Sequence, residues 1–113
     1  MDCLFCKIAN GDIPANIVYR DDLIFAIDDI NPQAPVHKLL IPQKHIATLN
    51  DLDNEDDDLL SHMVHSAAKL AKQLNMANDG YRLVMNCNAG AGQTVFHIHM
   101  HLLGGRQMVW PPG

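Results

Sequence analysis

A stripe of histidines near the carboxyl end constrains this chain more than any other feature. His97, His99 and His101 are separated by single apolar residues, Ile98 and Met100. Side chains two residues apart on a β-strand point to the same face of a sheet. The alternation therefore predicts a strand over residues 95–103, with three imidazoles on one face and apolar side chains on the other.

The rest of the chain predicts one long helix and several short strands. Apolar residues recur at three-to-four spacing between residues 54 and 75, which indicates a helix with one face packed on a sheet. Further strands are expected at 16–20, 23–28, 36–41 and 81–86, a short helical turn at 3–10 and a proline loop at 31–35. Short connections favour antiparallel pairing. We predict an α+β fold in one domain, residues 1–113: a five-stranded antiparallel sheet, one long helix and a short N-terminal helix.

Composition narrows the class of protein. The chain has 113 residues, of which 48% are apolar, and that is enough for one core. A net charge of −5 argues against general nucleic-acid binding. The apolar runs are too short for a membrane span, and the first residues do not look like a signal peptide, so we expect a cytoplasmic protein. Six of the residues 51–58 are acidic, which we interpret as caps at the start of the long helix.

The histidine stripe is compatible with two kinds of chemistry. Imidazole ligates zinc, and near neutral pH it also serves as a nucleophile or an acid–base group. The preceding loop, residues 86–94, has two glycines together with Gln93 and Thr94, and it suits contacts to phosphate oxygens. Cys3 and Cys6 form a C-x-x-C pair, which indicates either metal binding or simple burial. Cys87 is expected to be a small buried residue.

Nearly the whole chain resembles the histidine-triad (HIT) family. The signature is His97-Ile98-His99-Met100-His101-Leu102-Leu103, and residues 28–37 and 40–46 resemble the family's upstream segments. Residues 104–108 and the terminal Trp110-Pro111-Pro112-Gly113 look like the end of its Hint branch, the purine nucleoside phosphoramidases. The resemblance implies a nucleotide-binding hydrolase. Such an enzyme cleaves nucleoside 5′-phosphoramidates or related purine mononucleotide conjugates through a nucleotidyl-histidine intermediate.

The resemblance also implies a role for individual residues. His99 matches the nucleophile, His101 matches the histidine beside the phosphate and the leaving group, and His37 and His97 match supporting positions. It implies no metal in the reaction itself. The remaining matches concern nucleotide binding. Asn86, Gln93 and Thr94 match polar contacts near the phosphate, and Asp29 matches the contact to the ribose. The apolar purine pocket corresponds to Leu4, Phe5, Ile8, Ile13, Ile27 and Ile30, and Trp110 matches a residue that reaches the other subunit of a homodimer.

A structural zinc site is implied as well, because some bacterial relatives carry C-x-x-C at this position and bind zinc. The matching ligands are Cys3, Cys6, His45 and His97, a Cys₂His₂ set. His97 would then be a zinc ligand and also a residue that supports the nucleophile, His99. We interpret His62 and His65 as ordinary residues of the helix face.

Two other functions are compatible with the same residues. One is a nucleotide-binding regulatory or scaffolding module with incidental hydrolysis. The other is a zinc hydrolase that uses the stripe as ligands, although the stripe has no adjacent carboxylate base.

Overall fold

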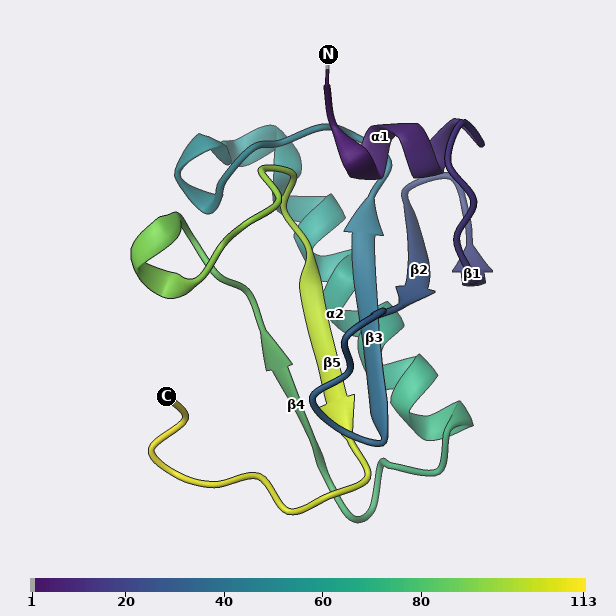
Figure 1. The fold of residues 1–113 in the computed structure, drawn as a ribbon, viewed down its shortest axis with the longest axis vertical. Coiled ribbons are helices and arrows are strands. Elements are labelled where there is room, and N and C mark those ends of the chain that lie inside the picture. Colours follow the sequence, from purple (N-terminus) through teal and green to yellow (C-terminus); the bar gives the residue numbers. More distant parts are fainter. Residues whose placement is uncertain (1) are drawn as a thin grey trace.

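The computed structural model describes residues 2–113 and has two layers, a sheet and a long helix packed on one face of it (Figure 1). Met1, the first residue of the predicted domain, lies outside the described residues. The sheet is antiparallel, with the order β1-β2-β3-β5-β4. Its strands are β1 (Ile17–Arg20), β2 (Ile24–Asp28), β3 (Val36–Pro42), β4 (Tyr81–Val84) and β5 (Met100–Gly104). The predicted α+β architecture with five antiparallel strands is confirmed.

The two helices lie on opposite faces of the sheet. Helix α2 (Asp57–Gln73) buries Leu59, Met63, Ala67 and Ala71 in the main core, together with Ile24, Leu40, Ile98, Met100 and Leu102. Helix α1 (Leu4–Ala9) packs Phe5 and Ile8 over a second cluster that contains Phe25, Ile27, Leu39 and Ile41. None of the helices among residues 2–113 is long and apolar enough to cross a membrane.

The long helix differs from its prediction in three details, of which one is that it ends at Gln73 rather than at residue 75. Residues Asn54–Asp56 form a separate 3₁₀ turn, and the α-helix begins at Asp57. Val64, expected on the apolar face, is 48% exposed. The buried residues follow an exact four-residue spacing, and Val64 lies about 100° around the helix from Met63, which turns its side chain toward solvent.

The acidic run caps backbone groups, as predicted, but the caps belong to two 3₁₀ turns that precede α2. In the first turn, Leu49–Asp51, Thr48 and Asp51 form a reciprocal capping box, and Asp53 and Asp56 form another in the second. The buried Asp56 carboxylate also pairs with Lys44 Nζ at 2.7 Å. The carboxylates thus stabilise the entry to the long helix.

The predicted strand over residues 95–103 is wrong in its first half, because β5 begins only at Met100. The backbone N–H of Ile98 donates to the carbonyl of Ile46 at 2.7 Å, and the carbonyl of His97 accepts from the His99 ring. These groups are therefore not free for a strand ladder. The alternation of side chains persists nevertheless, since Ile98, Met100 and Leu102 lie in the main core.

Candidate active site

A cavity of about 550 Å³ opens on the face of the sheet that carries α1. This volume lies in the range of small-molecule sites. Most of the sequence-predicted site residues line it: His99, His101, Asp29, Thr94, Leu4, Phe5, Ile8, Ile13, Ile27 and Ile30. Most of the lining is thus apolar and includes the fully exposed Ile30, and two imidazoles and the Asp29 carboxylate also line the cavity.

The hydrogen bonds of His99 determine which of its ring nitrogens can react. Nδ1 lies 2.8 Å from the carbonyl oxygen of His97. A carbonyl only accepts, so the proton of the neutral ring is on Nδ1 and the lone pair is on Nε2. The ring edge-packs against Phe5 at 5.1 Å between centroids, which further restricts its rotation. His99 therefore has a free basic nitrogen on a side chain that lines the cavity.

The same reasoning assigns the protons of His37 and His101. His37 Nδ1 accepts the backbone N–H of Gln33 at 3.0 Å, so its proton is on Nε2. That Nε2 lies 2.8 Å from His101 Nδ1 and donates to it. His101 consequently carries its own proton on Nε2. These hydrogen bonds form a relay that runs from the backbone N–H of Gln33 through His37 to His101. Its last group is the Nε2–H of the His101 ring, which lines the cavity.

Burial keeps both rings of this relay neutral near pH 7. Desolvation, with smaller contributions from the neighbouring His99 and His37, lowers the pKa of His101 to about 4. Desolvation also lowers the pKa of His37, although Asp29 opposes the shift. Asp29 Oδ2 lies 3.4 Å from His37 Nε2, and its Oδ1 accepts the backbone N–H of Asn31. One carboxylate thus faces both the relay and the cavity.

Three of the predicted nucleotide-binding residues do not line this cavity. Gln93 is buried, and its amide donates to the carbonyls of Ala47 and Val95 and accepts from the Asn88 N–H, which ties the loop to itself and to the segment that follows β3. Asn86 is half-buried. Trp110 is 82% exposed on the C-terminal tail, where the guanidinium of Arg82 holds the preceding carbonyl at 3.0 Å.

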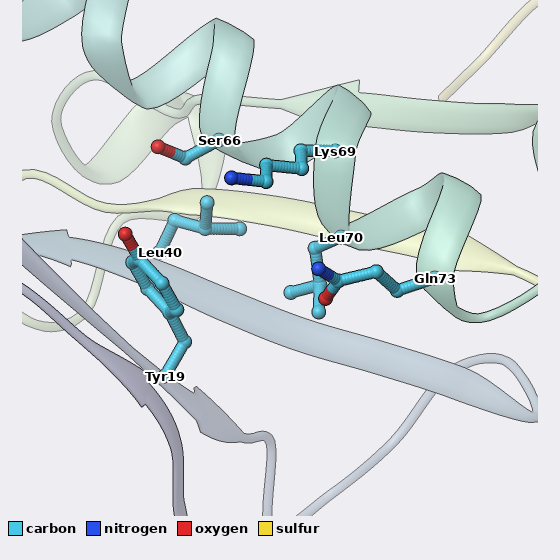
Figure 2. Close-up of a pocket in the computed structure, with 6 residues that line it drawn as sticks. All are labelled: Tyr19, Leu40, Ser66, Lys69, Leu70 and Gln73. Carbon is cyan, nitrogen blue, oxygen red and sulfur yellow. The ribbon is translucent and has the colours of Figure 1, made fainter.

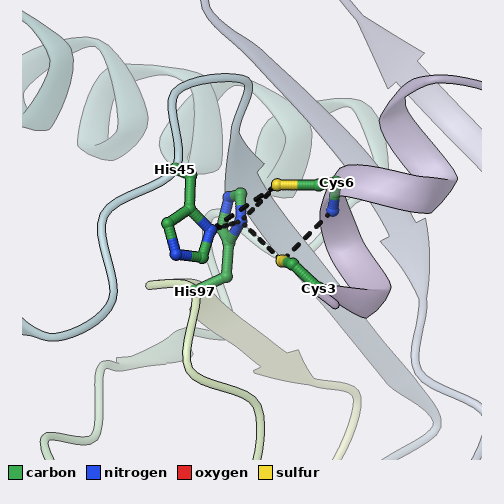
Figure 3. Close-up of side chains that lie close together, drawn as sticks. All are labelled: Cys3, Cys6, His45 and His97. Atoms are coloured by element: carbon green, nitrogen blue, oxygen red, sulfur yellow. Dashed lines mark hydrogen bonds between the residues drawn. The ribbon is translucent and has the colours of Figure 1, made fainter. Parts of the chain in front are cut away.

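Four side chains from three separate segments of the chain converge beside the cavity (Figure 3). His97 Nδ1 lies 3.3 Å from Cys3 Sγ, 3.6 Å from Cys6 Sγ and 3.1 Å from His45 Nδ1. His45 Nδ1 lies 3.5 Å from Cys6 Sγ. The structure therefore brings all four predicted metal ligands together, with their donor atoms within 4.8 Å of one another.

The donor set fits zinc. A tetrahedral ion with ordinary Zn–S and Zn–N bonds separates a sulfur from a nitrogen by about 3.5 Å and two nitrogens by about 3.3 Å, close to the spacings found here. His97 Nε2 donates to the carbonyl of Pro42 at 2.8 Å, so its Nδ1 lone pair faces the cluster. Burial lowers the pKa of His97, which favours the neutral form that binds metals. Cys3, Cys6, His45 and His97 can hold a metal ion.

Sequence reasoning missed the groups that orient these rings, because they are main-chain atoms: the N–H of Gln33 and the carbonyls of Pro42 and His97. Every residue has such groups, so no sequence pattern marks them. Only the tertiary fold shows which of them face a histidine.

The other face of the sheet has a cavity of about 60 Å³ between α2 and the sheet (Figure 2). Tyr19 and Ser66 line it, and His62 lies nearby, paired with Asp21 at 2.7 Å. Ser66 Oγ and Asp21 Oδ2 both approach the same nitrogen of His62, Nε2. A serine–histidine–aspartate triad needs its serine and its aspartate on different ring nitrogens. His62 is therefore a structural residue of the helix face, as the sequence predicts.

Known proteins resemble this chain over nearly its whole length. Residues 10–108 match the family described as HIT domain. A purine nucleoside phosphoramidase of Escherichia coli strain K12 is 52% identical over 107 residues, which cover 95% of this chain and 90% of the relative. A HIT-like protein of Synechocystis, described as uncharacterized, is 52% identical over 112 residues, covering 99% of this chain and 97% of the relative.

Solved structures agree with this assignment. The crystal structure of a HIT family hydrolase from Legionella pneumophila superposes with a TM-score of 0.98 at 58% identity, covering 99% of this chain and 100% of that one. A HIT family hydrolase from Clostridium thermocellum has a TM-score of 0.92 at 47% identity, and the match covers 96% of this chain and 94% of that one.

Proposed function

The chain belongs to the HIT family of hydrolases, and from this premise we propose that it cleaves purine nucleoside 5′-phosphoramidates through a nucleotidyl intermediate on His99. One observation carries the proposal: the hydrogen bond from Nδ1 to the His97 carbonyl assigns the lone pair of the neutral His99 ring to Nε2, and that ring lines a substrate-sized cavity. The relative from E. coli is named for this activity.

The apolar and polar residues that line the cavity suggest how a nucleotide lies in it. We propose that the purine packs on the apolar wall and that Asp29 accepts hydrogen bonds from the ribose hydroxyls. The phosphate then lies between Thr94, His99 and His101. Asn86 is proposed as a further polar contact on the phosphate side. The bonds that Gln93 makes to the backbone of Asn88 and of Ala47 suggest that it acts by holding the loop in place.

The reaction has two displacements at the same phosphorus. In the first, the lone pair of His99 Nε2 attacks, an N–P bond to the ring forms, and the P–N bond to the amine breaks. The departing nitrogen takes one proton from His101. In the second, a water oxygen attacks, the bond between phosphorus and His99 breaks, and His101 takes a proton from that water. The products are a nucleoside 5′-monophosphate and an amine, and two modest barriers replace one high barrier.

His101 needs a second proton before it can act as the acid. A neutral ring that gave up its only proton would become an anion, and the pKa of His101 is about 4 in the free site. A bound phosphate anion raises that pKa, because opposite charge favours the protonated ring. We propose that the proton enters with the substrate. This scheme places no metal in either step.

We also propose a cytoplasmic homodimer. Trp110 is an exposed apolar side chain at the end of a chain whose tail is anchored by Arg82, and it would contribute to the site of the partner subunit. Light scattering tests the dimer, which predicts twice the 12.5 kDa mass of one chain.

Mass spectrometry tests the proposed intermediate. Intact protein is quenched shortly after mixing with adenosine 5′-phosphoramidate, and we expect an added nucleotidyl mass on the wild type that His99→Ala lacks, together with loss of turnover. His65→Ala, on the exposed face of α2, is the matched control and keeps full activity.

Three outcomes would contradict the proposal. Full activity of folded His99→Ala would exclude the nucleophile. Tight mononucleotide binding without turnover of any phosphoramidate would indicate a binding module. A zinc hydrolase would be indicated if a chelator abolished turnover of the folded protein, zinc restored that turnover, and His99→Ala remained active.

A further inference from the structure

His97 connects two sites through two different parts of the residue. Its ring lies in the cluster with Cys3, Cys6 and His45, and it is fully buried there. Its carbonyl oxygen accepts the hydrogen bond from His99 Nδ1 that assigns the lone pair of the neutral His99 ring to Nε2. A shift of His97 would therefore move the group that fixes the orientation and the tautomer of the nucleophile.

Helix α1 makes the second connection. It supplies Cys6, its N-cap residue is Cys3, and between these two thiols it carries Phe5. The ring of Phe5 meets His97 and His99 edge-on, with centroids 5.8 and 5.1 Å away. The same helix supplies Leu4, Phe5 and Ile8 to the wall of the cavity. The thiols and the wall are therefore parts of one short rigid element.

Few other interactions hold α1 in place. Its backbone hydrogen bonds within the described residues stay between residues 3 and 13, and the guanidinium of Arg20 adds one contact to the Ala9 carbonyl at 3.4 Å. Six residues are too few for a helix to be stable without tertiary contacts. Burial of Phe5 and Ile8 and the convergence of the thiols on the imidazoles are what attach it to the sheet.

The two imidazoles of the cluster, in contrast, lie on segments that are already joined. The N–H of Ile98 donates to the carbonyl of Ile46, which connects the residues next to His97 and His45 at 2.7 Å. His97 is also anchored to the Pro42 carbonyl. A metal ion shared by these imidazoles and the thiols would join α1 to a fixed base.

We propose that the Cys3–Cys6–His45–His97 cluster is a positioning device for the active site: with zinc bound, it holds α1 so that Phe5 packs on His99 and the apolar wall of the nucleotide cavity is preformed. This inference rests on the proposed nucleotide site. Cys3, Cys6 and Phe5 act through other groups, and they are positioning residues rather than catalytic ones.

The test compares zinc-loaded protein with chelator-stripped protein, using adenosine 5′-monophosphate as the probe. Calorimetry measures its Kd, hydrogen exchange measures the protection of the α1 amides, and ¹⁵N NMR reports the tautomer of the His99 ring. We expect stripping to weaken binding about tenfold, because a wall that must order on binding costs affinity. The α1 amides lose protection while β3 and β5 keep theirs, and the His99 ring signals shift toward averaged tautomers.

Three variants divide the effect among its parts. Cys6→Ser removes one thiol and reproduces the stripped protein. Cys87→Ser removes the cysteine outside the cluster and leaves all three measurements unchanged. Phe5→Leu is measured in zinc-loaded protein. The apolar contact remains, so the α1 amides stay protected. The aromatic edge that contacts the His99 ring is lost, so nucleotide binding weakens and the His99 ring signals change.

Two results would overturn the inference. One is identical Kd, exchange and His99 signals in loaded and stripped protein. The other is loss of protection throughout the sheet on stripping, which would make the metal a general stabiliser of the fold. None of these measurements requires turnover. A protein with no phosphoramidase activity would refute the proposed function while the metal dependence of α1 and His99 could still be observed.

Discussion

His37 Nε2 donates a hydrogen bond to His101 Nδ1 at 2.8 Å, and a main-chain N–H on the far side of the His37 ring fixes the direction of that bond. The two rings therefore act as a pair in which only His101 lines the cavity. His37 is 6% exposed and belongs to β3, the strand that pairs with β5. Its position is set by the core of the sheet rather than by a flexible loop.

Replacing His37 with phenylalanine separates the relay from packing. His37→Phe keeps a ring of similar shape but gives His101 Nδ1 no donor, so His101 can take either tautomer and its N–H no longer points reliably at the substrate. We expect kcat to fall about ten- to a hundredfold with a much smaller change in KM. Steady-state kinetics on adenosine 5′-phosphoramidate measure both constants. An unchanged kcat would show that the relay does not serve the reaction.

The ribose contact proposed for Asp29 can be tested with a double-mutant cycle. If the carboxylate accepts from the 2′-hydroxyl, Asp29→Asn and removal of that hydroxyl from the substrate each weaken binding about three- to tenfold, and the combined loss is less than the product. KM values for ribo and 2′-deoxy substrates on both proteins complete the cycle. Fully multiplicative effects would place the 2′-hydroxyl elsewhere.

The low pKa of His101 makes folding stability depend on pH. The folded-state pKa is about 4, against 6.5 ordinarily, so the unfolded chain binds the extra proton first as the pH falls. Stability is therefore highest above pH 6.5, declines as the pH falls toward 4, and levels off below that value. We expect His101 to account for about 1–2 kcal/mol of the loss between pH 7 and pH 5.

Urea unfolding at the two pH values, on wild type and His101→Gln in the same metal state, measures this contribution. The variant lacks the titrating ring, so its loss of stability over the interval is smaller by that amount. Equal losses in the two proteins would show that His101 is not held neutral by the fold.

Much of the fold could be predicted because local patterns and core packing agree. The four-residue spacing of apolar side chains in α2 and the hydrophobic runs of β2 and β3 correspond to buried faces of the structure. The prediction failed at residues 95–99, where extended backbone was expected. Alternation of side chains cannot distinguish a strand from an irregular, bent segment, because the difference lies in which main-chain groups receive ladder partners.

The sequence by itself determined that His97, His99 and His101 share one side of the chain, since an alternating pattern on a core-packed segment leaves the polar residues no other face. It also determined the family, because the signature and its flanking segments are contiguous. The resemblance to the family implied a role for each ring, but the hydrogen-bond and cluster partners of each ring were decided by the tertiary structure alone. Cys3 and Pro42, which lie 94 and 55 residues from His97 in the chain, draw its ring into the metal cluster, and His37 orients His101 from another strand. Each ring has two nitrogens of nearly equal intrinsic basicity, so the tautomer of the neutral ring is set by the hydrogen-bond partner that folding brings to one of them.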